Sequence, residues 1–379
     1  MKDGWDIKKL GEVCLITMGQ SPNSESYNKL GDGLPFFQGC SDFGAIHPLV
    51  TTWCNQPNKI ANPNDILMSV RAPIGTLNIA DSKCCIGRGL AAFTQKEGVT
   101  INKFLYYFLL SSKGDLQSKG TGATFKAIGK ELIKNYAIKL PSLTEQQHIV
   151  EELDLLSSII EKKKAQLNEL DNLAQSLFYE MFGDPISNEK GWKLSTFNHE
   201  FEVTSGGTPS TRKKEYWDNG TISWIGSNMC QNKILSDNDG KYITKEGLKH
   251  SSAKLYYKGF VLVALVGATI GKCALLNFDT TTNQNIAGIN VPSNKYFEPY
   301  FVFFTLQSLY SLFQNIGEGK FKMANLSFVR SLPIIKPPLD LQQRFAKKVK
   351  SIEHQKELIK LSIKEVETLF NSRMDYYFN

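Results

Sequence analysis

The stretch "LPSLTEQQHIVEEL", residues 140–153, carries the chain from a loop into a helix. Thr144 stands three positions before a glutamine, a capping-box spacing that satisfies the free N–H groups of a helix start. The stretch "KPPLDLQQRFAKKV", residues 336–349, repeats this pattern 196 positions later, with Asp340 in the place of the threonine. Two helices are therefore expected to begin at equivalent points of a repeated chain.

An apolar heptad pattern follows each motif. In both helices the apolar residues recur at alternating steps of four and three, which is typical of a coiled-coil seam. One lysine interrupts each pattern, Lys163 in the first helix and Lys356 in the second. The predicted seam consists of Ile149, Leu153, Leu156, Ile160, Leu167, Leu170, Ala174, Leu177 and Met181, followed by Phe345, Val349, Ile352, Ile359, Ile363, Val366 and Phe370.

The repeat extends beyond the helices. "ILMSVRAPIG" at 66–75 aligns with "LVALVGATIG" at 262–271, again at an offset of 196. The "GW" openings at Gly4 and Gly191 align at an offset of 187, so about nine residues were inserted early in the second copy. Chance similarity between two amphipathic helices does not explain a constant offset over separated motifs. The chain is therefore predicted to be a tandem duplication.

Each copy is predicted to be a mixed α/β globule followed by a long helix, which gives an α+β fold class. A Trp-led strand, a polar loop, a central β hairpin and a short aromatic helix precede each long helix. The aromatic stretches Phe104–Leu110 and Tyr300–Leu306 have helical spacing, which favours core packing over base stacking. The expected organisation is a first globular domain at 1–143, a helix at 144–182, a linker at 183–189, a second globular domain at 190–339 and a second helix at 340–379.

The composition is that of a soluble globular protein, because 41% of the residues are hydrophobic and 21% are charged. The longest apolar run begins at Phe260 and is too short to span a bilayer, so it is interpreted as a buried strand. The first residues lack the apolar segment of a signal peptide. Seven cysteines without a C-x-x-C spacing predict neither a disulfide framework nor a zinc site. The cytoplasm is the expected compartment.

Charge is distributed unevenly along the chain. Residues 1–143 carry 16 basic and 11 acidic side chains, and residues 190–339 carry 17 and 10, so both globular domains are basic. The first helix has a net charge of −5 and the second of +2, and opposite charges favour pairing between the two helices. One basic domain is often only solvated surface. Two in tandem favour a polyanionic partner such as nucleic acid.

A search for catalytic motifs identifies no catalytic site. "GATIGKC" from Gly267 has the wrong glycine spacing for a P-loop and is interpreted as a hairpin. No H-E-x-x-H motif or glycine-rich S-adenosylmethionine loop occurs. The five histidines lack carboxylate or cysteine neighbours at metal-ligand spacing, and they are expected to be surface or capping residues: His47, His148, His199, His250 and His354.

Together these features resemble the specificity (S) subunit of type I restriction-modification systems. The resemblance rests on the "P-x-L-x-x-Q-Q" helix starts at Pro141 and Pro337, the "FYEMFGDP" linker at 178–185, the "GW" openings and the two-fold repeat. The family loop reads Pro-Pro-Leu-x-Glu-Gln, and the first copy matches it at Leu143, Glu145 and Gln146. The second copy departs from it, because Leu341 replaces the glutamate.

The resemblance implies a function and a set of partners. Each globular domain would be a target-recognition domain for one half of a bipartite double-stranded DNA sequence, and the helices would pair as an antiparallel coiled coil that sets the spacing. The subunit would be non-catalytic and would bind no cofactor or metal. Two methyltransferase (M) subunits would bind S-adenosylmethionine, and restriction (R) subunits attached through them would use ATP and Mg²⁺. No membrane is involved.

Polar and basic loop residues are the candidates for DNA contact. Lysine mostly contacts phosphate, whereas arginine, glutamine and asparagine can pair with base edges. Each candidate is equally compatible with a solvated surface residue. The candidates are Gln20, Ser21, Arg71, Lys119, Thr121, Thr124 and Lys126 in the first copy and Thr208, Ser210, Thr211, Arg212, Lys213, Lys320 and Lys322 in the second.

Two other functions remain open from the sequence. A stand-alone DNA-binding or architectural scaffold protein would share the basic domains and the helices but would not associate with a methyltransferase. A nucleic-acid enzyme with an unrecognised site would turn over DNA in the presence of Mg²⁺, ATP and S-adenosylmethionine.

Overall fold

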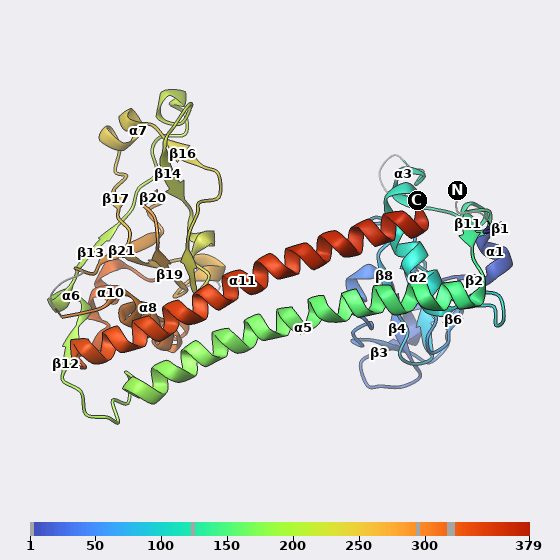
Figure 1. Ribbon diagram of the computed structural model, residues 1–379, viewed down its shortest axis with the longest axis horizontal. Helices are drawn as coiled ribbons and strands as arrows, with labels where there is room; N and C mark the ends of the chain where they lie inside the picture. The colour runs from blue at the N-terminus through green and yellow to red at the C-terminus, as the bar shows by residue number, and fades with distance from the viewer. Residues whose placement is uncertain (1–3, 123–125, 293–295, 317–322) are drawn as a thin grey trace. The chain divides into compact units, whose positions relative to one another are not determined.

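The computed structural model describes residues 4–122, 126–292, 296–316 and 323–379. The chain divides into two compact units (Figure 1). Unit 1 consists of the residues up to 164 together with 361–379, and unit 2 consists of residues 165–360. Both units contain helices and β-sheets, which confirms the predicted α+β class. In the part of the chain that is described, no helix is long and apolar enough to cross a bilayer.

Unit 1 combines short sheets with helices. Its helices are α1 (Leu10–Val13), α2 (Asn102–Ser111), α3 (Lys113–Ser118), α4 (Lys130–Lys134) and the first part of α5 (Leu143–Phe182). Its strands are β1 (Asp6–Lys9), β2 (Cys14–Met18), β3 (Tyr27–Asn28), β4 (Leu34–Phe37), β5 (Trp53–Cys54), β6 (Ile60–Ala61), β7 (Ile66–Ser69), β8 (Leu77–Ile79), β9 (Cys84–Ile86), β10 (Leu90–Gln95) and β11 (Ala137–Leu140). They form the sheets β1-β11, β2-β10-β7-β8 and β3-β5-β4-β9-β6.

Unit 2 has the same kind of construction. Its helices are α6 (Phe197–Glu200), α7 (Lys245–Lys249), α8 (Pro299–Ser308), α9 (Tyr310–Gln314), α10 (Leu326–Ser331) and the first part of α11 (Leu339–Phe378). Its strands are β12 (Leu194–Thr196), β13 (Glu202–Ser205), β14 (Ile222–Ile225), β15 (Lys233–Leu235), β16 (Tyr242–Ile243), β17 (Leu255–Tyr256), β18 (Val261–Ala264), β19 (Cys273–Leu276), β20 (Thr280–Thr282), β21 (Ile286–Asn290) and β22 (Pro333–Ile335). They form the sheets β12-β22, β13-β21-β18-β19-β15 and β16-β14-β20-β17.

The sheet topologies confirm the tandem duplication. In unit 1, β10 lies antiparallel between β2 and β7, and in unit 2, β21 lies antiparallel between β13 and β18. One parallel pair also corresponds, β4 with β9 in unit 1 and β14 with β20 in unit 2, whereas the parallel pair β15–β19 is found in unit 2 alone among the described strands. The hairpin predicted around Gly267 is confirmed, because β18 and β19 pair antiparallel on either side of it.

The predicted alignment of 66–75 with 262–271 at an offset of 196 is wrong by one residue for the strand at its start. Leu90 stands opposite Ser69 and Ile286 opposite Ala264, so β7 and β18 correspond at an offset of 195 and not 196. The loop after β18 is one residue longer, which restores the offset of 196 at the following glycine. Gly75 and Gly271 therefore coincide, with φ of +80° and +76°, values that favour glycine.

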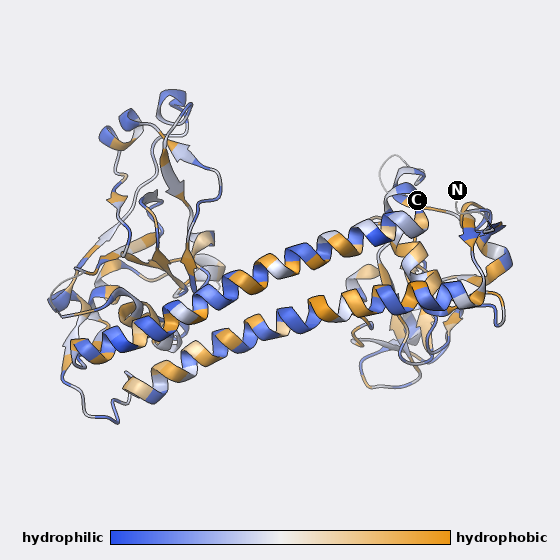
Figure 2. Ribbon diagram, in the orientation of Figure 1, coloured by the Kyte–Doolittle hydropathy of each residue, from blue (hydrophilic) through white to orange (hydrophobic). Residues whose placement is uncertain are grey.

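The aromatic helices α2 and α8 are buried against the sheets, which confirms their predicted role in packing. Phe104 and Phe108 belong to the main core of unit 1, and Phe301 and Phe304 belong to that of unit 2. Strand β18 is buried along its whole length, as its continuous apolar run predicted. Figure 2 shows these apolar strands and helices within each unit and the mixed hydropathy of α5 and α11.

The repeated Gln-Gln motif is explained by its first glutamine. Gln146 is fully buried. Its Nε2 donates to the carbonyl oxygens of Pro141 (2.9 Å) and Val99 (3.3 Å), and its Oε1 accepts from the N–H of Ile101 (2.9 Å) and the hydroxyl of Thr100 (3.2 Å). The side chain thus ties the start of α5 to the loop that enters α2.

Gln342 does the same in unit 2. Its Nε2 donates to the carbonyl oxygens of Pro337 (2.9 Å) and Tyr296 (3.1 Å), and its Oε1 accepts from the N–H of Glu298 (3.0 Å). This residue is also fully buried. The helix start of each copy is therefore connected to the preceding aromatic helix by one amide side chain.

The predicted capping boxes are wrong. α5 already begins at Leu143, so Thr144 lies inside the helix, and it is Ser142 Oγ that accepts from the N–H of Glu145 (3.3 Å). α11 begins at Leu339, which places Asp340 in its first turn. Glu145, the glutamate of the family loop, does not act as a cap. Its Oε1 accepts a hydrogen bond from Trp5 Nε1 (3.1 Å).

The C-terminal ends of the long helices are parts of hydrophobic cores. Phe178 and Phe182 of α5 are fully buried in the core of unit 2, where the ring of Phe182 lies 4.8 Å from that of Phe301. At the equivalent positions of α11, Met374 and Phe378 are buried in the core of unit 1. The ring of Phe378 lies 5.4 Å from that of Phe104. Each core is thus completed by the helix of the other repeat.

Several seam positions are buried inside these cores. Ile149 and Leu153 lie in the core of unit 1, and Phe345 and Val349 lie in that of unit 2. Leu177 is half-buried against the core, whereas the fully buried Phe178 and Phe182 were not part of the predicted heptad.

Ion pairs join the two long helices within each unit. Glu152 of α5 contacts Arg373 of α11 in unit 1 (2.5 Å), and Asp171 of α5 contacts Lys356 of α11 in unit 2 (2.5 Å). Lys356 is the lysine that interrupts the heptad, and Glu353 binds it as well (2.8 Å). Burial lowers the pKa of Lys356, but its bonds to the two carboxylates outweigh burial and raise the pKa above its usual value.

Replacing Gln146 or Gln342 with alanine should lower the free energy of unfolding by about 2 kcal/mol, because buried backbone groups lose their partner. The neighbouring glutamines Gln147 and Gln343 are exposed and provide a matched control. Their alanine variants should change stability by less than about 0.5 kcal/mol. Denaturant unfolding of the full chain measures the stability of all four variants. If the variants of Gln147 and Gln343 were destabilised as much as those of Gln146 and Gln342, the role given to the buried glutamines would be contradicted.

Replacing Phe182 or Phe378 with alanine should lower the free energy of unfolding by about 3 to 4 kcal/mol, because each substitution leaves a cavity in a core. Amide hydrogen exchange should show faster opening of α8 in the Phe182→Ala variant and of α2 in the Phe378→Ala variant. Leu173→Ala and Leu369→Ala are controls, because these side chains are 52% and 49% exposed. If both phenylalanine variants showed faster exchange in the same unit, the assignment of Phe182 to the core of unit 2 and of Phe378 to that of unit 1 would be contradicted.

Candidate nucleic-acid interface

In unit 1, loops from distant parts of the sequence meet at one edge of the sheets. The loop after β2 is bonded to the loop between β9 and β10, with Gly19 N–H donating to Leu90 O (2.9 Å) and Gln20 N–H to Ile86 O (3.0 Å). The segment after β7 joins them through the bond from Val70 N–H to Gly89 O (2.9 Å). We call residues 19–24, 70–72, 87–89 and 126–128 the first loop edge.

The last of these segments also joins by backbone bonds. Ala72 N–H donates to Lys126 O (3.2 Å), and Ile128 N–H donates to Val70 O (3.0 Å). Thr121 and Ala127 exchange backbone bonds of 3.0 and 2.9 Å next to it. The first loop edge is therefore held together by backbone hydrogen bonds, which leave its side chains available.

Unit 2 has an equivalent edge. Gly206 N–H donates to Ile286 O (3.2 Å) and Gly207 N–H to Thr282 O (2.9 Å). Leu265 N–H donates to Asn285 O (2.8 Å), and Ala324 N–H donates to Leu265 O (2.8 Å). These bonds repeat those of unit 1, and we call residues 206–211, 265–267, 283–285 and 323–325 the second loop edge.

Glycine is required where the loops cross. A Cβ on Gly19 would collide with the carbonyl oxygen of Gly87, and a Cβ on Gly206 would collide with Thr282. Each glycine is followed two positions later by a hydroxyl residue, Ser21 or Thr208, and then by a buried proline. The same close approach therefore presents the same kind of polar turn in both units.

The hydroxyl groups of these turns bind side chains and backbone of the neighbouring loop. Ser21 Oγ contacts both polar atoms of the Gln38 side chain (3.0 and 3.1 Å) and accepts from the N–H of Arg88 (3.3 Å). Thr208 Oγ1 donates to Gln284 Oε1 (2.7 Å). Ser21 and Thr208 therefore fix the geometry of each edge.

Most of the predicted DNA-binding residues lie on or beside these edges. Gln20, Arg71, Thr121 and Lys126 are exposed at the first loop edge. Ser210, Thr211 and Arg212 are exposed at or next to the second. Their contact with DNA remains a prediction.

Two predicted lysines have protein partners. The ammonium of Lys119 contacts Asp115 (2.6 Å) and lies over the ring of Tyr136 (4.9 Å). Lys213 Nζ donates to the hydroxyl of Tyr216 (2.9 Å), and this bond raises the pKa of the lysine. Thr124, Lys320 and Lys322 were also predicted, and they lie outside the described residues.

Tryptophans support the second loop edge from within unit 2. Trp224 Nε1 donates to Gly207 O (3.3 Å), and Trp217 Nε1 donates to Ser210 O (3.2 Å). The two rings contact each other edge to face at 5.3 Å. The turn from 206 to 211 therefore rests on an aromatic base.

Arg88 and Gln284 belong to the loop edges and Gln38 lies beside the first edge, but none of the three was predicted. Arg88 and Gln284 are exposed at the centres of their loops, and Gln38 is partly buried beside Ser21. The Gly-Arg-Gly triplet at 87–89, which aligns with Asn-Gln-Asn at 283–285, was the available sequence signal. Their proximity to the Ser-Pro and Thr-Pro turns is long-range and had no local signature.

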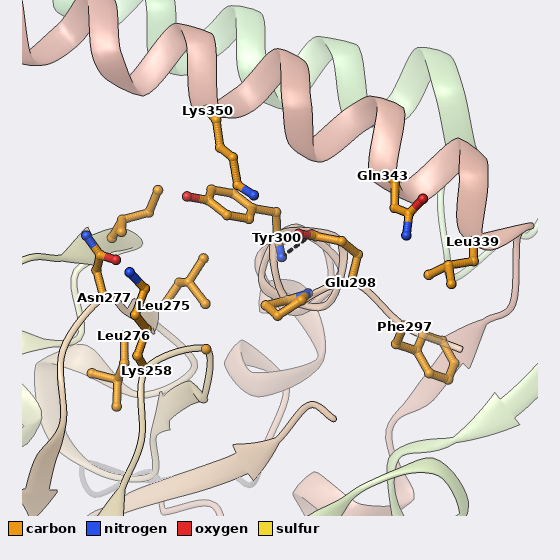
Figure 3. A pocket seen from close by; sticks show the side chains of 13 residues that line it. Lys258, Leu275, Leu276, Asn277, Phe297, Glu298, Tyr300, Leu339, Gln343 and Lys350 are labelled. Carbon is orange, nitrogen blue, oxygen red and sulfur yellow. Dashed lines mark hydrogen bonds between the residues drawn. The ribbon is translucent and has the colours of Figure 1, made fainter. Parts of the chain in front are cut away.

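Unit 2 also contains a pocket of about 470 Å³ next to the start of α8 (Figure 3). Lys258, Asn277, Glu298, Tyr300 and Lys350 are among its lining residues. The carboxylate of Glu298 accepts from the N–H of Tyr300 (2.7 Å), so it caps α8, and burial raises its pKa. In this pocket the carboxylate of Glu298 therefore supports the start of α8.

The described residues 4–122, 126–292, 296–316 and 323–379 contain no cluster of metal-ligating side chains. In these ranges no group of three histidine, cysteine, aspartate or glutamate side chains is placed to hold a metal ion. The five histidines are all exposed, which confirms their predicted surface position. The seven cysteines are free thiols.

Known specificity subunits align with this chain. The specificity subunit of the type I restriction enzyme MjaIX of Methanocaldococcus jannaschii is 24% identical over 394 residues, which cover 94% of this chain and 90% of that protein. The EcoR124I/EcoR124II specificity subunit of Escherichia coli is 29% identical over 207 residues, 50% of this chain and 48% of its own. A third alignment, 40% identical over 177 residues, covers 46% of this chain and 42% of an M. jannaschii protein named for the specificity subunit of the enzyme MjaX.

Solved structures share the fold. The crystal structure of a type I restriction-modification S subunit from M. genitalium has a TM-score of 0.58 at 15% identity, and the match covers 100% of this chain and 97% of that one. A chain from a structural study of complex assembly and conformational transition in the type I system has a TM-score of 0.63 at 17% identity, covering 100% and 98%.

A family model described as the type I restriction modification DNA specificity domain matches residues 2–172 and 189–368, once in each repeat. These two ranges contain both loop edges and the first three quarters of α5 and α11. The chain therefore belongs to the family of type I restriction modification DNA specificity domains.

Proposed function

We propose that this chain is the DNA-specificity subunit of a type I restriction-modification complex. Each unit contacts one half of a bipartite double-stranded DNA target through its loop edge. The observation that carries this proposal is the duplicated edge, which exposes polar side chains on a hydrogen-bonded backbone in both units. Unit 1 exposes hydroxyl, amide, guanidinium and ammonium groups there, and unit 2 exposes hydroxyl and amide groups with Arg212 beside them. Those groups suit base edges and phosphates.

The long helices set the distance between the two half-sites. α5 and α11 each contain 40 residues, about 60 Å of helix at 1.5 Å per residue. The ion pairs Glu152–Arg373 and Asp171–Lys356 support antiparallel pairing as a coiled coil, because the later residue of α5 is paired with the earlier residue of α11.

The helices also bind the methyltransferase subunits. In unit 2 an apolar groove between α5 and α11 is lined by Leu170, Leu173, Leu358 and Ile359. Leu173 and Leu358 are 52% and 53% exposed, and their apolar surface in this groove suits a protein partner. Two methyltransferase subunits bound in this way carry S-adenosylmethionine, and restriction subunits attached through them use ATP and Mg²⁺. The specificity chain itself contributes no catalytic group and works in the cytoplasm.

A stand-alone DNA-binding or architectural protein would have no methyltransferase partner. Co-purification of the chain with a methyltransferase encoded beside it separates the two functions. Turnover of DNA by the pure chain with Mg²⁺, ATP and S-adenosylmethionine would instead identify an enzyme and contradict the proposal.

Exchanging residues 1–143 for the same segment of another specificity subunit should change one half of the methylated target, because each unit contacts its half-site independently. The reciprocal exchange of residues 190–339 should change the other half only. Sequencing of methylated adenines in cells that express each hybrid measures this. If the methylated motif of a hybrid changed in both half-sites, or in neither, the proposal of independent half-sites would be refuted.

Inserting one heptad into both helices should lengthen the spacer. The insertions belong after Lys164 in α5 and after Lys360 in α11, between the units, because each helix ion pair then stays intact within its own unit. Seven residues add about 10.5 Å of helix, or about 3 base pairs at 3.4 Å per base pair. The methylated motif should keep both half-sites and gain about 3 base pairs between them. An insertion into α5 alone is the control and should abolish specific methylation, whereas an unchanged spacer with both insertions would disprove the role of the helices.

A further inference from the structure

Arg88 and Gln284 occupy equivalent positions in the two units. Gly87 N–H donates to Phe37 O (2.8 Å), and Asn283 N–H donates to Ile225 O (3.1 Å). Arg88 and Gln284, which follow these two residues, therefore leave equivalent parallel strand pairs, β4–β9 and β14–β20, at the same position. The next strands also correspond, since Leu90 opposite Ser69 matches Ile286 opposite Ala264. Both side chains are exposed at the centre of their loop edge.

The backbone around Arg88 is held tightly. Arg88 lies between Gly87 and Gly89, and a Cβ at either glycine would collide with Gln38. Its own N–H donates to Ser21 Oγ (3.3 Å). Within the described residues its guanidinium has no hydrogen-bond or ion-pair partner. Arg88 is therefore the one side chain that this narrow loop projects outward, from a fixed backbone.

The side chain of Gln284 is oriented by the equivalent hydroxyl. Thr208 Oγ1 donates to Gln284 Oε1 (2.7 Å), which fixes the oxygen end of the amide. The second lone pair of Oε1 and both hydrogens of Nε2 remain available for another partner. Asn283 on one side stabilises the loop, since its Oδ1 accepts from the N–H of Asn285 (3.1 Å).

These two side chains pair with different bases. The guanidinium fork of arginine donates two parallel hydrogen bonds to O6 and N7 of guanine. The amide of glutamine donates to N7 of adenine and accepts from its N6 amino group, which is the pairing that the orientation of Gln284 allows. At equivalent positions of the repeated scaffold, unit 1 therefore carries a side chain that pairs with guanine and unit 2 carries one that pairs with adenine.

On the basis of the proposed function, we propose that Arg88 and Gln284 are equivalent specificity-determining residues. Arg88 pairs with a guanine in the half-site of unit 1, and Gln284 pairs with an adenine in the half-site of unit 2. Ser21 and Thr208 are positioning residues, because they hold these loops and do not themselves pair with the base.

The test exchanges the two residues in the full chain, in complex with its methyltransferase subunits. Arg88→Gln should convert one guanine of the first half-site to adenine and leave the second half-site unchanged. Gln284→Arg should convert one adenine of the second half-site to guanine and leave the first unchanged. Selection of bound duplexes from random DNA gives the preferred motifs, and each variant should bind the wild-type site about tenfold less tightly or worse.

Two further variants separate base contact from phosphate contact. Arg88→Lys keeps the charge but loses the fork that donates two parallel hydrogen bonds, so the preference for guanine should weaken. Arg344→Gln makes the same chemical change at an exposed arginine of α11 and should leave the motif unaltered. If Arg88 contacts only phosphate, Arg88→Lys will keep the wild-type motif and Arg88→Gln will weaken binding to all sequences equally, which overturns the proposal.

The outcomes distinguish this inference from the proposed function. A wild-type complex that selects no bipartite motif would refute the proposed function. A wild-type complex with a bipartite motif that neither Arg88→Gln nor Gln284→Arg alters would refute only the assignment of these residues. Because both residues are exposed, unchanged thermal unfolding of the variants should show that they fold normally.

Discussion

The burial of aromatic side chains at the ends of the two long helices is the interaction on which the rest of the structure depends. Phe182 of α5 completes the core of unit 2, and Phe378 of α11 completes that of unit 1. A buried phenylalanine side chain contributes about 2 to 3 kcal/mol relative to an exposed one. Each helix therefore belongs to both units, because it starts against the core of one and ends inside the core of the other.

This shared construction gives the helices a structural reason to be long and regular. A helix that leaves one core and enters another is held at both ends, and its start is attached to the globular part by the buried amide of Gln146 or Gln342. The loop edges belong to the same units as these attachments. A fixed number of helical residues can then be converted into a fixed separation of half-sites, which is what a bipartite target requires.

Duplication also explains which residues differ between the copies. Groups with a required structural role are repeated, such as the two buried glutamines of the helix starts and the glycines at 19 and 206 where the loops cross. Glu145, which bonds to Trp5, is replaced by Leu341 in the second copy, and Leu341 and Trp192 both pack against the core of unit 2. Trp192 Nε1 instead donates to Phe182 O (2.8 Å). The scaffold is conserved between the halves, whereas an exposed position such as 88 or 284 is free to differ and so to distinguish two half-sites.

The sequence by itself determined the repeat, the order of elements, the two long helices and the packing role of the aromatic helices. These features depend on periodicity and on residue types within a few turns or strands, so they are visible locally. Tertiary structure alone decided that Ser142 and not Thr144 caps α5, and that Phe178 and Phe182 are the buried residues at the end of this helix. It also decided that β7 and β18 correspond at a sequence offset of 195 residues. It also decided that Ser21 meets Arg88 and that Thr208 meets Gln284, 67 and 76 positions away. Such contacts depend on strand register and on partners far along the chain, and local propensity carries no information about either.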